Sequence, residues 1–273
     1  MDSVKGQAVP AFWALGLILA LSAIGKAERL PIKTYTTADG LAHNMLNRIV
    51  RDSRGFLWFC TREGLSRFDG YSFTNYGIGQ GLPGGAVNDL VETRQGVYWV
   101  ATDGGLCRFD PLGKEQAGIN STSEGQKGPG RAMFAVYFPA GDTRSKQVLS
   151  VLQDRSGVIW CGTSNGLYRV ETAVDQVKIE SVDLGIPDYL QFRTVDCLLE
   201  DRRGTLWIGA ESGLYRRWPD GRVEAYTTLQ GLPDNMIHSL LEDGEGQIWI
   251  GMQLGGLCRL VPDPVPRHNV VAR

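Results

Sequence analysis

The sequence is poor in the residues from which catalytic and metal centres are usually built. It has only three histidines, and its five cysteines are odd in number, widely spaced and form no Cys-x-x-Cys pair. Metal sites and disulfide frameworks need such residues in clusters with defined spacing. We therefore expect no metal, no cofactor and no catalytic residues, and we interpret the cysteines as core residues: Cys60, Cys107, Cys161, Cys197 and Cys258.

An excess of charge of one sign is also lacking. The 28 Lys and Arg residues are balanced by 30 Asp and Glu residues, which leaves a net charge of -2. Proteins that bind nucleic acid present a basic field to the phosphate backbone. The charge balance therefore argues against a nucleic-acid partner.

Long hydrophobic runs are missing beyond the first 27 residues. The apolar run from Val9 to Ile24 is about 16 residues long, short for a membrane span. Lys5 precedes it, and Gly25-Lys26-Ala27 places small residues at the two positions that a signal peptidase reads. We interpret residues 1–27 as a signal peptide and expect an exported, periplasmic protein. The alternative is an uncleaved signal that anchors the chain to the inner membrane by its N-terminus.

What the sequence does have is glycine, 35 residues in all, and an internal repeat. Five segments share a turn of the form Asp-x-x-Gly (Thr in the second), a Trp six residues after its first position, and then Gly-Leu-x-Arg. The intervals between successive tryptophans are 41, 61, 47 and 42 residues, close to the length of one four-stranded propeller blade. A polar insertion over residues 111–130 accounts for the long interval. The five tryptophans are Trp58, Trp99, Trp160, Trp207 and Trp249.

Each repeat has the pattern of a β-meander. The strand around the tryptophan is apolar at consecutive positions, as expected where both faces of a strand are covered. The first unit should contain strands over Asn47–Arg51, Phe56–Thr61, Leu65–Phe68 and Ser72–Tyr76. We predict an all-β fold, a β-propeller of four-stranded blades over residues 28–273, as a partial ring or a five-bladed one. The repeats run approximately over 41–81, 82–141, 142–184, 185–231 and 232–273.

The repeat resembles a known family. Gly-Leu-x-x-Asn, then Asp-x-x-Gly-x-Leu-Trp-Ile-Gly, then Gly-Leu-x-Arg-Phe-Asp-Gly is similar to the two-component regulator propeller repeat, over about Tyr35 to Leu260. This resemblance implies the periplasmic sensor region of hybrid or sensor histidine kinases, where rings of seven units are common. The chain has five clear units and no kinase motif, so we expect a fragment or a separate sensor subunit that is not an enzyme.

The resemblance implies a ligand-sensing module of a two-component signal transduction system. Its expected partners are a small polar ligand, which in some relatives is an oligosaccharide, and a histidine kinase or further propeller blades. Two alternatives stay open, because propellers host unrelated functions. One is an enzyme on the propeller scaffold, such as a lyase or a quinoprotein-like enzyme, and the other is a passive protein-binding scaffold.

The candidate ligand-binding residues follow from the meander. Successive connections alternate between the two ends of a propeller, so the Asp-x-x-Gly turns take one end. The other end collects the turns before each Gly-Leu-x-Arg and the connections between blades, which vary from unit to unit and suit a polar ligand. These residues are Arg62, Glu63, Asp103, Ser164, Asn165, Glu211, Ser212, Gln253, His43, Asn44, Asp234 and Asn235.

Overall fold

The structure is a computed structural model that describes residues 30–112, 133–138, 146–173, 176–187 and 192–262. The expected signal peptide and most of the expected insertion at 111–130 lie outside the described residues. The chain divides into two units, Met1–Thr34 and Tyr35–Arg273. The described part of the first unit, residues 30–34, has no regular secondary structure.

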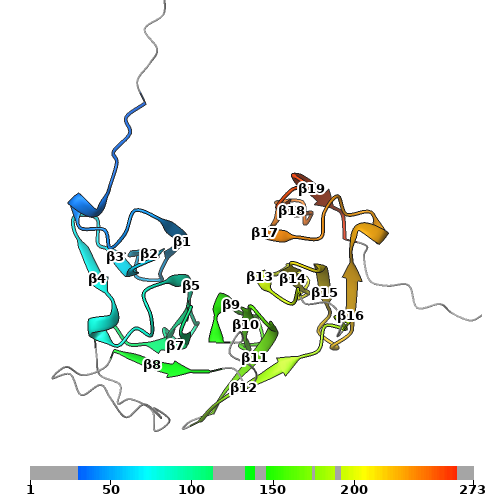
Figure 1. The fold of residues 1–273 in the computed structure, drawn as a ribbon, viewed down its shortest axis with the longest axis horizontal. Coiled ribbons are helices and arrows are strands. Elements are labelled where there is room, and N and C mark those ends of the chain that lie inside the picture. Colours follow the sequence, from blue (N-terminus) through cyan, green and yellow to red (C-terminus); the bar gives the residue numbers. More distant parts are fainter. Residues whose placement is uncertain (1–29, 113–132, 139–145, 174–175, 188–191, 263–273) are drawn as a thin grey trace, which may run out of the picture. The chain divides into compact units, whose positions relative to one another are not determined.

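The second unit is an all-β, five-bladed β-propeller (Figure 1). Each blade is an antiparallel meander whose strands pair in chain order. Blade 1 contains β1 (Leu46–Arg51), β2 (Leu57–Thr61), β3 (Gly64–Phe68) and β4 (Phe73–Tyr76); blade 2 contains β5 (Val87–Glu92), β6 (Tyr98–Thr102), β7 (Gly105–Phe109) and β8 (Phe134–Tyr137). Blade 3 contains β9 (Val148–Gln153), β10 (Ile159–Thr163), β11 (Gly166–Ala173) and β12 (Gln176–Val182).

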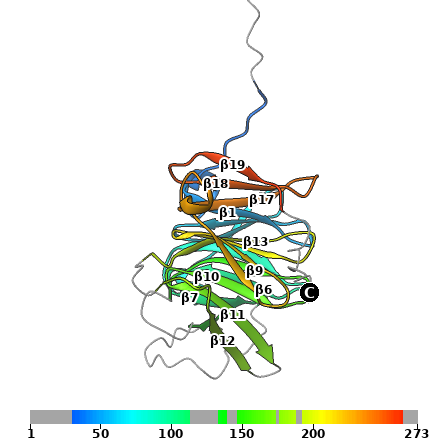
Figure 2. The same cartoon turned by 90° about the vertical axis from the view of Figure 1, so that its right-hand side faces the viewer.

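Blade 4 contains β13 (Val195–Glu200), β14 (Leu206–Ala210), β15 (Gly213–Arg217) and β16 (Val223–Tyr226). Blade 5 has three strands within the described residues, β17 (Ile237–Glu242), β18 (Ile248–Met252) and β19 (Leu257–Leu260). The first strands of successive blades, from β1 to β17, lie next to one another around the centre (Figure 1). The β11–β12 hairpin projects from the rim of blade 3 (Figures 1 and 2).

Short 3-10 helices in the described residues precede the first strands of three blades: η1 (Thr37–Asp39), η2 (Ile78–Gln80) and η4 (Thr228–Gln230). Within the described ranges, no helix has the length and apolar character needed to cross a membrane.

The Asp-x-x-Gly turn, which has Thr93 in place of Asp in blade 2, precedes the second strand of each blade. In blade 1, the Asp52 carboxylate accepts the backbone N–H groups of Arg54 at 3.0 Å and Phe56 at 2.9 Å. Its other oxygen accepts the indole N–H of Trp58 at 2.9 Å, which ties the turn to the core. Burial alone raises the pKa of Asp52, but these hydrogen bonds and one from Tyr98 hold that pKa below its usual value. The turn therefore orders the backbone and orients the tryptophan together.

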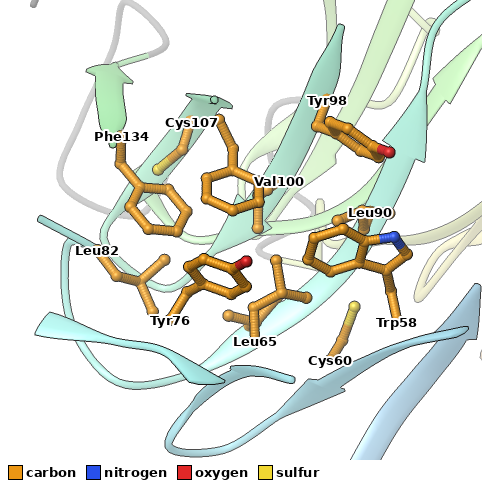
Figure 3. Packing of buried hydrophobic residues seen from close by; sticks show 12 residues of the cluster. Trp58, Cys60, Leu65, Tyr76, Leu82, Leu90, Tyr98, Val100, Cys107 and Phe134 are labelled. Atoms are coloured by element: carbon orange, nitrogen blue, oxygen red, sulfur yellow. The ribbon is translucent and has the colours of Figure 1, made fainter. Parts of the chain in front are cut away.

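The core consists of apolar layers between consecutive blades. Trp58 packs with Leu90, Tyr98 and Val100 of blade 2, as Figure 3 shows, and Trp99, Trp160 and Trp207 occupy the same place at the next three junctions. The predicted burial of both faces of the second strand is confirmed for β6, β10 and β14, whose five residues are all buried.

The cysteines pack in these layers as free thiols. Cys60, Cys107 and Cys161 are buried, and Cys197 and Cys258 are partly buried. Burial raises the pKa of Cys107 and of Cys161 to about 12, so both are protonated at neutral pH.

Candidate functional site

In blades 1 to 3, the candidate residues between the second and third strands lie on turns that a buried threonine stabilises. In blade 1, Thr61 donates from its hydroxyl to the carbonyl of Gly64 at 2.8 Å and accepts the N–H of Glu63 at 3.2 Å. Thr102 and Thr163 repeat these contacts in blades 2 and 3. The backbone of the turn is thus fixed by a framework residue, and the two residues between are free to differ among blades. We call the end of the propeller formed by these turns and the blade connections the connector end.

Two of the predicted residues stabilise the connections. The side-chain oxygen of Asn44 accepts the N–H of Thr37 at 2.9 Å, and that of Asn235 accepts the N–H of Thr228 at 2.8 Å. Both acceptors bind the first residue of a 3-10 helix, η1 or η4. Asn44 therefore holds the segment that leads into blade 1, and Asn235 holds the connection between blades 4 and 5.

Three further predicted residues are also bound locally. His43 accepts the N–H of Met45 on Nδ1 at 3.0 Å, and the Ser212 hydroxyl, which is buried, lies 2.9 Å from the hydroxyl of Tyr215. Asp234 accepts the N–H of Leu254 at 2.9 Å, and this hydrogen bond lowers the pKa of the carboxyl. These contacts shape the turns and leave less of each side chain available to a ligand.

A polar network joins blades 1, 2 and 3 at the connector end. Asn47 Nδ2 lies 3.4 Å from Asn88 Oδ1, and Asn88 Nδ2 donates to Asp103 Oδ1 at 2.9 Å. Gln147 donates to the same oxygen at 3.1 Å and accepts the hydroxyl of Ser164 at 2.6 Å. The structure thus brings Asp103 and Ser164 together through Gln147, and Asn88 and Asn47 extend the network; the sequence analysis missed all three of these linking residues.

A second polar cluster lies between blades 4 and 5. His238 Nδ1 is 3.1 Å from a carboxylate oxygen of Asp196, and the imidazole is half exposed. Burial raises the pKa of Asp196; the charge of Glu211 raises it further, whereas His238 opposes the shift. Glu211 is the predicted residue that belongs to this cluster.

An ion pair lies on the innermost strands of blades 1 and 2. Arg48 Nε lies 3.4 Å from Asp89 Oδ1, and Asp89 is buried while Arg48 is largely exposed. Burial raises the pKa of Asp89, against the opposing effects of Arg48 and of the N–H of Val151 at 3.1 Å. The residues of these clusters that the sequence analysis missed could have been found from one shared feature. They stand at the second or third position of an innermost strand: Asn47, Arg48, Asn88, Asp89, Asp196 and His238.

The other predicted residues are not gathered into these clusters. Arg62 and Glu63 are exposed on the turn between β2 and β3, and Gln253 is exposed on the turn after β18. Asn165 lines a cavity of about 280 Å³ with Leu184, Ile186 and Arg193, between blades 3 and 4. Cavities of about 350 to 480 Å³ also occur between blades at the Asp-x-x-Gly end, so cavity volume alone does not favour the connector end.

The residues do not assemble into an evident metal centre. Within the part of the chain that the structure describes, no three His, Cys, Asp or Glu side chains are placed to hold a metal ion together. The clusters offer amide and carboxylate hydrogen-bonding groups, and one histidine paired with a carboxylate.

Comparisons with known proteins agree with the repeat. The family model described as two component regulator propeller matches residues 81–104, 189–212 and 231–253. A histidine kinase, P4, from Formosa agariphila is 38% identical over 58 residues, which are 21% of this chain and 4% of that protein.

Solved structures share the fold. The extracellular domain of a putative hybrid two component system from B. thetaiotaomicron superposes with a TM-score of 0.64 at 24% identity, over 85% of this chain and 30% of that one. Virginiamycin B lyase from Staphylococcus aureus superposes with a TM-score of 0.54 at 12% identity, over 79% of this chain and 70% of that one. At these identities the similarity establishes the architecture alone. The chain spans less than a third of the length of the kinase and of the sensor structure.

Proposed function

We propose that this chain, which is a two-component regulator propeller domain resembling the extracellular sensor domains of hybrid histidine kinases, binds a small polar ligand at its connector end and acts in signal transduction. The proposal includes export to the periplasm and a histidine kinase as the signalling partner. It assigns no catalytic step to the chain.

The observation that carries the proposal is the polar network of Asn88, Asp103, Gln147 and Ser164. Residues that are the same in every blade form the framework of the fold. We therefore expect the specificity for a ligand to come from positions that differ among the blades. The second position of the innermost strand, by contrast, is Asn47, Asn88, Leu149, Asp196 and His238 in blades 1 to 5.

The chemistry of these side chains selects the class of ligand. Amides both donate and accept hydrogen bonds, and carboxylates accept them, as recognition of a ligand rich in hydroxyl or amide groups requires. The nearby acids Asp103, Asp196 and Glu211 disfavour an anionic ligand. A neutral oligosaccharide fits this description.

The test begins with a thermal-shift screen of the chain against neutral mono- and oligosaccharides and short peptides, followed by calorimetry on each hit. The double variant Asn88→Ala/Asp103→Ala should weaken binding at least about tenfold, because hydrogen bonds to charged groups contribute about 1.5–3 kcal/mol. Lys178→Ala, which removes an exposed ion pair with Glu180 on β12, is the matched control and should bind normally.

Two outcomes would count against this assignment. Binding that survives the double variant but is lost in Arg217→Ala would place the ligand in the cavity between blades 3 and 4 at the Asp-x-x-Gly end. Turnover of a hit, rather than reversible binding, would favour an enzyme, and the Asp196–His238 pair would then be the first acid–base candidate.

A further inference from the structure

Each blade presents one face to the blade that follows it. Three positions make this outgoing face: the fifth residue of the innermost strand, the tryptophan of the second strand and the leucine of the third. At the four junctions inside the chain, all three pack in the layer against the next blade. The triplets are Val50, Trp58 and Leu65; Val91, Trp99 and Leu106; Leu152, Trp160 and Leu167; and Leu199, Trp207 and Leu214.

Blade 5 has the same outgoing face, and no blade among the described residues covers it. Its triplet is Leu241, Trp249 and Leu257, and the two leucines are 63% and 66% exposed. Trp249 is only partly buried, although its indole N–H donates to Asp243 at 2.8 Å as in the other blades. An apolar face of this kind, continuous and built on a blade pattern, marks an interaction surface.

A hydrogen bond accompanies every internal junction. The residue after the turn Asp or Thr donates its backbone N–H to a Glu or Gln that ends the innermost strand of the following blade. We call this contact the latch. It joins Ser53 to Glu92 at 2.6 Å, Arg94 to Gln153 at 2.9 Å, Arg155 to Glu200 at 2.9 Å and Arg202 to Glu242 at 3.0 Å.

The donor's side chain extends the latch where it is arginine. Arg202 donates to the carbonyl oxygens of Asp243 at 2.8 Å and Gly244 at 2.7 Å, in the turn of the next blade. Arg94 reaches the carbonyl oxygen of Asp154 in the same way, at 3.1 Å. The latch therefore depends on two features of the following blade: the acceptor side chain at the end of its innermost strand and the backbone carbonyls of its turn.

The two ends of the chain do not satisfy this latch with each other. Arg51 ends the innermost strand of blade 1, at the place that Glu or Gln occupies in blades 2 to 5. A guanidinium has no acceptor, so it cannot receive the N–H of a turn. Gly244 stands in blade 5 where Ser53, Arg94, Arg155 and Arg202 stand in the other blades. Blade 1, from the same chain or from a second copy, is therefore a poor neighbour for blade 5.

We propose that the outgoing face of blade 5 is a docking surface for a further blade of the same repeat whose innermost strand ends in Glu or Gln. The apolar triplet of blade 5 supplies the contact area. The Glu or Gln of the incoming blade determines which blade can dock, because it accepts the latch hydrogen bond. Arg51 excludes blade 1 from this place and keeps the chain from joining head to tail.

The test gives blade 1 the acceptor that a blade needs to dock on the outgoing face of blade 5. Arg51→Glu creates the acceptor, and Gly244→Arg adds the missing side chain of the latch. Gly244 accepts this change because its φ lies outside the left-handed region and a Cβ there meets no atom within 4 Å. The double variant should gain a blade 5 to blade 1 contact, within one chain or between copies. Amide hydrogen exchange over β17–β19 reports covering of the face, and sedimentation separates closure from association.

We expect exchange over β17–β19 to slow at least about tenfold in Arg51→Glu/Gly244→Arg relative to the parent chain, consistent with a charge-assisted hydrogen bond. Adding Leu241→Asp should abolish the protection. Adding Leu229→Asp should not, since Leu229, which is 91% exposed, lies on η4 outside the face. The proposal fails if the double variant gains neither protection nor mass, or if the parent chain already shows the same protection.

Discussion

The inner blades and blade 5 share one sequence pattern, but the tryptophan and the second strand are buried to different degrees in them. Trp207 of blade 4 is fully buried and its strand β14 has five buried residues, whereas Trp249 of blade 5 is partly exposed and β18 is covered only at alternate positions. Both tryptophans donate to the turn Asp in the same way, at 2.9 and 2.8 Å. Local hydrogen bonding is therefore a property of the single repeat, and burial is a property of the pair of neighbours.

The first and largest effect should come from removing a tryptophan at an inner junction. Trp160→Ala should cost about 3–5 kcal/mol of unfolding free energy, because it empties a packed layer between blades 3 and 4. Trp249→Ala should cost clearly less, since its outward side has no blade against it. Urea unfolding followed by circular dichroism compares the two. Equal losses would mean that the face of blade 5 is covered in solution.

The next effect concerns the turn. Asp201 is buried and accepts the N–H groups of Arg203 and Thr205 and the indole of Trp207, each at 2.9 Å. Asp201→Ala should cost about 2–3 kcal/mol, because it leaves buried donors without an acceptor.

Asp243→Ala in blade 5 is the matched change and should destabilise less, since water reaches its donors. The measurement is again the midpoint of urea unfolding. A larger loss for Asp243→Ala than for Asp201→Ala would contradict the dependence on neighbours.

The same distinction explains which parts of the fold the sequence could predict. The strands of blade 1 were predicted to within one residue at each end, for example Ser72–Tyr76 against the observed Phe73–Tyr76. Their ends depend on Asp-Gly turns that the local sequence determines. The roles of Asn44 and Asn235 were also readable in principle, because each follows the first residue of a 3-10 helix by seven positions.

The polar network was not predictable in this way. Asn88 contacts Asp103 within its own blade and the carbonyl of Val148 in the next, and the second contact spans 60 residues. Contacts of this kind depend on how one blade is set against the next. The variation of the turn residues indicated the connector end. It could not show that Asp103 and Ser164 join a network between blades whereas Arg62 and Glu63 stay exposed on their turn.

The smallest effect is a pair of opposite pH dependences. Hydrogen bonds from Gln247 and Trp249 hold the pKa of Asp243 in blade 5 below its ordinary value of 3.8. Burial raises the pKa of Asp89, at the junction of blades 2 and 3, above 3.8. A lowered pKa contributes stability that is present above pH 3.8 and is lost as the pH falls through the folded value. A raised pKa has the reverse effect: its cost is absent below pH 3.8 and grows as the pH rises through the folded value.

Replacing each acid by Asn removes its ionisation while keeping an acceptor oxygen. The stability of the parent chain relative to Asp243→Asn should therefore increase as the pH rises from the folded pKa of Asp243 towards 3.8. Relative to Asp89→Asn, the stability of the parent chain should decrease as the pH rises above 3.8. Urea unfolding at intervals from about pH 2 to 7 measures both differences, since the Asp243 effect lies below pH 3.8. Slopes of the same sign would show that the Arg48 ion pair and the Val151 hydrogen bond outweigh burial at Asp89.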